Sequence, residues 1–126
     1  MAFPSPYTLD AIASLDLFEK NNLLAQVQEK SQRLTQLLQP LKTHPHVGDI
    51  RQKGFMTGIE VVENKSTRKS FDPSRRIGNH ICHRLRSRGI ILRPLGDVIV
   101  MMPPLAMPID DIARIVEALH QELLRL

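Results

Sequence analysis

The spacing of apolar residues changes abruptly near residue 45, and this change constrains the fold more than any other feature of the chain. From Leu23 to Leu41 apolar side chains recur every three or four residues, with polar residues between them. This spacing predicts an amphipathic helix, which Pro40 bends or ends in its last turn. Beyond the turn His44–His46 the period falls to two, which predicts strands. The chain is therefore expected to pack helices against a sheet.

The same reasoning predicts two hairpins and three further helices. The strands are expected at Val47–Gln52 and Phe55–Glu63 around a Lys53–Gly54 turn, and at Ile90–Leu95 and Val98–Met102 around a Gly96–Asp97 turn. The further helices are expected from Ser5 to about Lys20, from Asp72 to a left-handed cap at Gly89, and from Met107 onward, with 64–75 as a polar surface loop. Segregated hairpins and helices predict an α+β fold, an α/β sandwich whose antiparallel-rich sheet of about four strands is covered by about four helices.

Length and composition fit one soluble domain over residues 1–126. A chain of 126 residues has room for a single core. Its 42% hydrophobic and 24% charged residues are typical of a globular protein. No apolar run approaches the roughly 20 residues that span a bilayer, and the opening Met-Ala-Phe-Pro-Ser-Pro lacks the features of a signal peptide. The single cysteine, Cys82, excludes an internal disulfide, so we expect no membrane contact and a cytoplasmic location.

The net charge of +4 raises the possibility of an anionic partner. The basic cluster comprises Lys65, Arg68, Lys69, Arg75, Arg76, Arg84, Arg86 and Arg88. A nucleic-acid-binding surface usually interleaves such residues with aromatic side chains, but the only aromatic residue nearby is Phe71. We interpret the cluster as a solvated loop and an exposed helix face and expect no nucleic-acid partner, although a basic nucleic-acid-binding domain stays a rival hypothesis.

No motif predicts catalysis by this chain alone. His80 and His83 are three residues apart on a predicted helix, but neither a CxxC nor an HExxH motif accompanies them, so we expect a polar surface and no metal. Cys82 lies on the apolar side of the same helix, which favours an inert core thiol. The motifs GxSxG, GxGxxG and the P-loop are absent. The sequence therefore offers no catalytic, cofactor-binding or metal-binding residue.

Arg93 is the most unusual charged residue because it interrupts an apolar strand. Its planar guanidinium has five donors, fits a carboxylate by two-point contact and stays charged. Pro94 removes a backbone donor, which marks an edge or a bulge. From the residues alone two interpretations are equally open. Arg93 is either a site for an anion or a structural residue, which extends into solvent from an edge strand or pairs with Asp49, Glu60 or Asp97.

Several segments together resemble the small domain of the class III, pyridoxal-phosphate-dependent aminotransferases. They are His46–Glu60, Arg75–Gly78, Arg88–Ile99, Met102–Pro104 and the closing amphipathic helix, so the likeness covers about Asp10 to Leu126. The Arg-Pro-Leu-Gly turn and the Met-Pro-Pro segment are most similar to the branch of the family that acts in biotin biosynthesis. The ornithine, acetylornithine and 4-aminobutyrate branches are the alternatives.

The resemblance implies a C-terminal small domain of a fold-type I enzyme, cut away from the large domain on which it packs. In the full-length homodimeric enzyme it would close the substrate side of the pyridoxal phosphate cleft, and Arg93 would bind the carboxylate of a small keto-acid substrate. The Schiff-base lysine of the family belongs to the large domain, whereas Lys53, Lys65 and Lys69 stand in turns or a basic loop. We therefore expect this chain to be inactive and free of cofactor; the rival is a stand-alone carboxylate-binding module.

Separation from a large domain has a further consequence. Apolar surface that the large domain would cover is expected to be exposed, including Met101, Met102 and Pro103–Pro104, and to cause weak self-association. The opening residues also fit the family poorly, because an Asn-Pro and small residues usually precede the first helix.

Overall fold

The computed structural model describes residues 3–126, so Met1 and Ala2, which belong to the opening without signal-peptide features, lie outside it. The helical elements are α1 (Pro6–Lys20), α2 (Leu23–Leu37), α3 (Gln39–Lys42), the 3₁₀ turn η1 (Pro73–Arg75), α4 (Ile77–Arg86) and α5 (Ile109–Leu123). The strands are β1 (Val47–Lys53), β2 (Met56–Val61), β3 (Arg93–Leu95) and β4 (Val98–Met101). None of the helices described in residues 3–126 has the length and apolar character needed to cross a bilayer.

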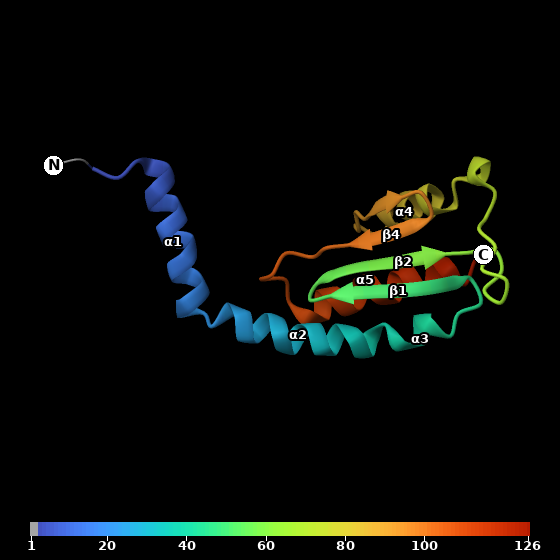
Figure 1. Ribbon diagram of the computed structural model, residues 1–126, viewed down its shortest axis with the longest axis horizontal. Coiled ribbons are helices and arrows are strands. Elements are labelled where there is room, and N and C mark those ends of the chain that lie inside the picture. The colour runs from blue at the N-terminus through green and yellow to red at the C-terminus, as the bar shows by residue number, and fades with distance from the viewer. Residues whose placement is uncertain (1–2) are drawn as a thin grey trace.

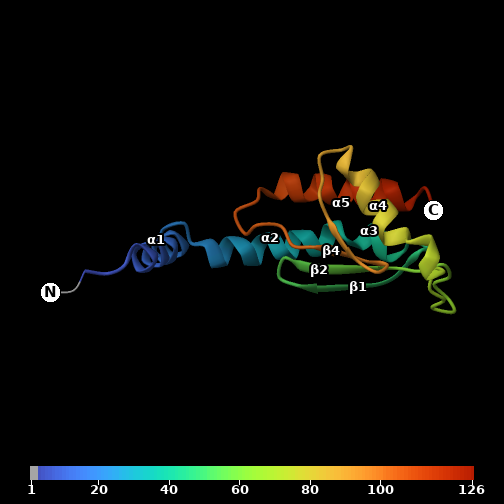
Figure 2. The same ribbon diagram turned by 90° about the horizontal axis from the view of Figure 1, so that it is seen from above.

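The four strands form one antiparallel sheet in the order β1-β2-β4-β3. One face is buried: Thr57 and Ile59 of β2 lie opposite Met101 and Ile99 of β4, and all four are almost inaccessible. The core forms where this face meets leucine and isoleucine side chains of α2, α4 and α5. Figure 1 shows the sheet face on, and Figure 2 shows α5 on one side with β1 and β2 on the other. The predicted α+β fold is thereby confirmed.

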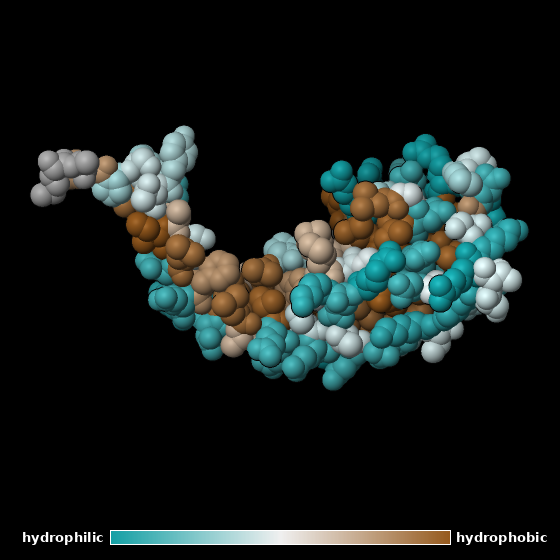
Figure 3. Space-filling model, in the orientation of Figure 1, coloured by the Kyte–Doolittle hydropathy of each residue, from teal (hydrophilic) through white to brown (hydrophobic). Residues whose placement is uncertain are grey.

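Helix α1 extends away from the rest of the molecule as an arm (Figure 1). Its start is capped as predicted, because the side chain of Ser5 accepts a hydrogen bond from the backbone N–H of Thr8 at 3.2 Å. Asn22, in the left-handed region with φ of 50°, separates it from α2. No side chain of α1 is buried. Its apolar residues form part of the brown surface of the arm in Figure 3, and they include Leu9, Ile12, Leu15 and Leu17.

The first hairpin differs from the prediction by one residue. Lys53 pairs with Met56, so the turn is Gly54–Phe55 and not Lys53–Gly54. Gly54 takes the left-handed conformation, φ of 59°, while Phe55 is buried and anchors the turn in the core. Strand β2 also ends at Val61, two residues before the predicted Glu63. The next backbone N–H, that of Val62, donates to the carbonyl of His46 in the turn before β1.

Two predicted boundaries in the second half are also wrong. Asp72 caps the short turn η1, not the helix, and Arg76 in the left-handed region separates η1 from α4. The loop 64–75 holds an isolated bridge between Asn64 and Lys69, and Phe71 within it is buried. Strand β3 starts at Arg93 and not at Ile90, because the N–H of Ile90 donates to the carbonyl of Leu85 at the end of α4. The left-handed cap at Gly89, φ of 76°, is confirmed.

Candidate functional site

Arg93 lies on the outer edge of the sheet, on the face that no helix covers. Strand β3 lies at the edge of the sheet. The backbone N–H that Pro94 lacks is therefore not needed for a hydrogen bond between interior strands. Arg93 lies opposite Val100 of β4, which lies opposite Gly58 of β2. Residues paired in this way share one face of a sheet. The alternate positions Ile99 and Met101 point into the core, which leaves Arg93 exposed on the opposite face.

The turn that carries Arg93 is anchored to the start of α4. Gly96 adopts a left-handed conformation, φ of 58°, and closes the β3–β4 hairpin with Asp97. The carboxylate of Asp97 accepts a hydrogen bond of 3.0 Å from the backbone N–H of Gly78 in the first turn of α4. The approach is so close that a Cβ on Gly78 would lie 2.3 Å from the carbonyl oxygen of Gly96. The position of β3, and with it of Arg93, is thus set by α4.

The acids considered as partners of Arg93 are engaged elsewhere. Asp49 and Glu60 both lie beside Arg51, at 3.6 and 3.5 Å from its Nη1. Asp97 binds the backbone of Gly78. Among residues 3–126 no carboxylate forms an ion pair with Arg93. Its guanidinium can therefore accept an external anion without breaking an internal salt bridge.

An apolar hollow of about 290 Å³ adjoins Arg93. It is lined by the ends of β3 and β4, the segment that follows them and α5, through Ile91, Leu92, Val100, Met101, Met102, Pro103, Pro104, Met107 and Ile115. The predicted exposure of the Met-Pro-Pro segment is confirmed in half of its residues: Met102 and Pro104 are exposed, whereas Met101 and Pro103 are buried. The prediction failed there because alternation along β4 turns Met101 into the core. An arginine beside an apolar hollow suits a carboxylate attached to an alkyl chain.

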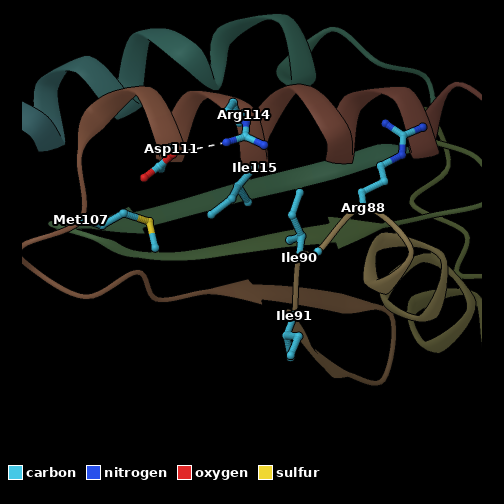
Figure 4. Close-up of a pocket in the computed structure, with 8 residues that line it drawn as sticks. Arg88, Ile90, Ile91, Met107, Asp111, Arg114 and Ile115 are labelled. Atoms are coloured by element: carbon cyan, nitrogen blue, oxygen red, sulfur yellow. Dashed lines mark ion pairs between the residues drawn. The ribbon is translucent and has the colours of Figure 1, made fainter.

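A second hollow, of about 280 Å³, shares Ile91, Met107 and Ile115 with the first. Figure 4 shows Arg114 beside Asp111 and directly above Ile115, while Arg88 stands apart from them, beyond Ile90. Each arginine already has an acid: Arg114 lies 3.6 Å from Asp111, and Arg88 lies 3.2 Å from Glu122. Both arginines therefore have an acidic partner within the chain, although Arg88 shares Glu122 with Arg84, and this distinguishes the hollow from the one beside Arg93.

The other residues considered for chemistry are not brought together. His80 and His83 are exposed on α4, and residues 3–126 contain no group of three or more metal-ligating side chains that could hold an ion. Cys82 is buried as predicted, and burial raises the pKa of its thiol. A raised pKa leaves little thiolate at neutral pH, so it is a poor nucleophile.

The lysines do not form a site for pyridoxal phosphate. Lys53, Lys65 and Lys69 are exposed, and a hydrogen bond to Glu63 raises the pKa of Lys69. A Schiff-base lysine needs the opposite, a depressed pKa in a desolvated pocket. Lys30 is half-buried, but its ammonium donates to the carbonyl of Met107 at 3.1 Å. These lysines therefore do not fit the role of the cofactor's Schiff-base residue.

Sequence reasoning missed one feature of the site and one of the fold. Met107 and Ile115 line the hollow, although they lie 14 and 22 positions after Arg93 and were predicted only as helix start and helix core. The exposure of α1 was also missed, because apolar residues in a sequence look the same whether or not another surface covers them.

The chain matches the family model of the class-III aminotransferases over residues 8–123. That match covers most of the chain, which therefore belongs to the class III aminotransferases.

Among its relatives is the adenosylmethionine-8-amino-7-oxononanoate aminotransferase of Nitratidesulfovibrio vulgaris, 46% identical over 110 residues, or 87% of this chain and 20% of the relative. The crystal structure of the enzyme of that name from Methanocaldococcus jannaschii superposes with a TM-score of 0.87 at 36% identity, covering 91% of this chain and 26% of that one. A chloroplastic gamma aminobutyrate transaminase of Solanum lycopersicum is 29% identical over 106 residues, or 84% of this chain and 20% of the relative. The chain thus spans about a fifth to a quarter of the length of the relatives it matches.

Proposed function

We propose that this chain is the C-terminal, substrate-side domain of an aminotransferase of biotin biosynthesis. The full-length enzyme would transfer an amino group from S-adenosylmethionine to 8-amino-7-oxononanoate with pyridoxal phosphate as its cofactor. Sequence identity supports this branch of the family. The chain is 46% identical to a relative named for this activity and 29% identical to a gamma-aminobutyrate transaminase. The large domain would supply the cofactor lysine, and the chain alone would be inactive.

The exposed guanidinium of Arg93 carries this proposal. It forms no salt bridge within residues 3–126 and lies beside an apolar hollow, which is the combination that suits an ω-carboxylate on an alkyl chain. In the proposed enzyme Arg93 binds the carboxylate of 8-amino-7-oxononanoate, at the end of the molecule far from the reacting keto group. It acts by positioning the substrate, not by acid–base chemistry, because an arginine keeps its proton.

A hybrid enzyme tests the role of Arg93. In the relative from Nitratidesulfovibrio vulgaris, this chain replaces the matching 110 residues. We expect Arg93→Ala to raise the KM for 8-amino-7-oxononanoate by about 10- to 100-fold, the usual loss for a charge-assisted hydrogen bond, and to leave the KM for S-adenosylmethionine unchanged. The matched control is Arg51→Ala on the same sheet face, whose arginine is already paired with Asp49 and Glu60. Equal losses for both substrates would remove Arg93 from the carboxylate role.

The isolated chain tests whether it is part of a larger enzyme or a binding module. Pyridoxal phosphate added to the chain is expected to produce no absorbance band of a lysine-bound cofactor. Calorimetric titration with 8-amino-7-oxononanoate is expected to give no binding tighter than millimolar, because only one wall of the proposed site is present. A stable band, or micromolar binding that Arg93→Ala abolishes, would instead support a stand-alone module.

A further inference from the structure

A cluster of three histidines lies where the turn before β1 meets the C-terminal end of α5. His44 and His46 belong to the turn, and His120 belongs to the last turn of α5. The ring centroids of His44 and His46 are 5.9 Å apart, and those of His44 and His120 are 6.2 Å apart in an edge-on arrangement. Residues more than 70 positions apart in the chain thus bring three imidazole rings into one seam.

His44 is held in its neutral form by its hydrogen bond. The residue is only 7% exposed, and its Nδ1 accepts a hydrogen bond of 3.1 Å from the backbone N–H of His46. Both ring nitrogens of a protonated histidine are donors, so protonation would set two N–H groups against each other. Burial, in first place, holds the pKa of His44 below its ordinary value of 6.5, and the nearby His46, His120 and Lys65 lower that pKa further.

The charged groups that act on His44 are all basic. His46 lies in the same turn, His120 comes from α5, and Lys65 comes from the loop after β2. The ammonium of Lys65 is held near this turn, because it donates to the carbonyl of Lys42 at the end of α3. Glu122, also at the end of α5, lies against Arg84 and Arg88 instead. Among residues 3–126, the charged groups that act on His44 therefore all oppose a positive charge on its ring.

His46 and His120 are the two rings that lie against His44. The Nδ1 of His46 lies 2.9 Å from the carbonyl oxygen of Val62, so this nitrogen donates in the neutral ring and continues to donate in the charged one. His120 stands at the C-terminal end of a helix, where the helix dipole favours a cation. A positive charge on either of these two rings lowers the pKa of His44.

We propose that His44, His46 and His120 form an acid-sensitive latch that holds the turn before β1 against α5 at neutral pH and releases it on acidification. The N–H of Val62 donates to the carbonyl of His46 at 2.9 Å, so the end of β2 loosens with the turn. The latch depends only on this domain and not on the aminotransferase assignment.

The direction of the pH dependence follows from the lowered pKa of His44. Between that pKa and 6.5, the opened state binds more protons than the closed state. Stability from the latch is therefore complete above about pH 6.5, falls as the pH decreases below it, and stops falling below the pKa of the closed state. For one proton the opening equilibrium increases by up to about tenfold per pH unit.

Two measurements on the intact 126-residue chain test the latch. In an NMR titration of the histidine ring protons, His44 is expected to stay neutral to a lower pH than the exposed His80 and His83. In hydrogen exchange from pH 7.5 to 5.5, corrected for intrinsic rates, the amides of His46, Val47 and Val62 are expected to lose up to about tenfold protection per pH unit, while Ile59 and Ile99 keep theirs. Titration of His44 together with His80 and His83 would overturn the proposal.

Variants separate the latch from general acid unfolding. His44→Asn keeps an acceptor for the N–H of His46 but cannot titrate, so it is expected to abolish the local opening between pH 7.5 and 5.5. His120→Gln removes one neighbouring charge and is expected to shift the opening to lower pH, whereas His83→Gln on the exposed side of α4 is the matched control. Unchanged opening in folded His44→Asn would contradict the latch. If His44→Asn does not fold, the titration of the unmodified chain decides.

Discussion

The Nε of Arg84 lies 2.6 Å from Oε2 of Glu122, and the side chain of Glu122 is only 2% exposed. Arg88 approaches the same carboxylate at 3.2 Å, and both arginine side chains are about one third exposed. This ion-pair cluster joins α4, the residues after it and α5 at the edge of the core.

Removal of Arg84 is expected to destabilise the domain, because it leaves a buried carboxylate with less compensation. We expect Arg84→Ala to lower the free energy of unfolding by about 1–3 kcal/mol, less than for a fully buried pair because Arg88 remains and solvent reaches both guanidinium groups. Urea unfolding at pH 7 measures this. Arg114→Ala, which breaks the exposed Arg114–Asp111 pair, is the control and is expected to cost no more than about 0.5 kcal/mol. Equal effects for the two variants would contradict a structural role of the buried pair.

Gly78 is expected to be intolerant of any side chain. A Cβ there would lie 2.3 Å from the carbonyl oxygen of Gly96, and backbone atoms cannot move aside as a side chain can. Gly78→Ala should therefore lower the free energy of unfolding by about 2–3 kcal/mol. In Gly58→Ala the new Cβ would meet Val98 at an ordinary 3.5 Å, so thermal unfolding of this variant should match that of the unmodified chain. A stable Gly78→Ala would show that the contact between α4 and the β3–β4 turn is not rigid.

Arg93 is expected to contribute nothing to the stability of the domain. It is exposed and forms no salt bridge with residues 3–126, so Arg93→Ala should change the free energy of unfolding by less than about 0.5 kcal/mol. Chemical denaturation of Arg93→Ala beside Arg84→Ala gives the comparison. A loss as large as that of Arg84→Ala would mean that Arg93 is a structural residue.

Helix α1 is expected to be dispensable for the folding of the rest of the chain. Its 15 residues bury no side chain, and a helix of this length is marginal in water on its own. A variant that lacks residues 1–20 should unfold at the same urea concentration as the full chain. In the full chain the amides of α1 should exchange fast while those of α5 are protected. Slow exchange in α1 that depends on protein concentration would instead mean that a second copy covers this helix.

The elements were predicted well where their signals are local. The hydroxyl of Ser5 caps α1 by accepting a hydrogen bond from an N–H of the first turn. Gly89 ends α4 because a residue without a Cβ readily adopts the left-handed conformation. Both effects operate within one turn of helix. The hairpin boundaries were wrong where long-range contacts decide them. Phe55 belongs to the first turn, where its ring is buried in the core. Ile90 does not belong to a strand, because its N–H donates to the carbonyl of Leu85 at the end of α4.

The sequence indicated Arg93 as a candidate site residue but did not indicate which residues surround it. Arg93 stood out because a permanent charge interrupted an apolar strand, and the choice between an internal acid and an external anion stayed open. The structure assigns Asp49 and Glu60 to Arg51, and Asp97 to Gly78. Which acid meets which arginine depends on the strand order, and periodicity along one strand carries no information about strand order.

The sequence by itself determined the family and the α+β composition and singled out Arg93 as a candidate, because motifs, caps and apolar periods act over a few neighbouring positions. Only the tertiary structure decided that Arg93 lies on an uncovered face, that α1 buries nothing and that His44 meets His120. These are distances between residues far apart in the chain. They arise when the elements pack against one another, so no local pattern of residues records them.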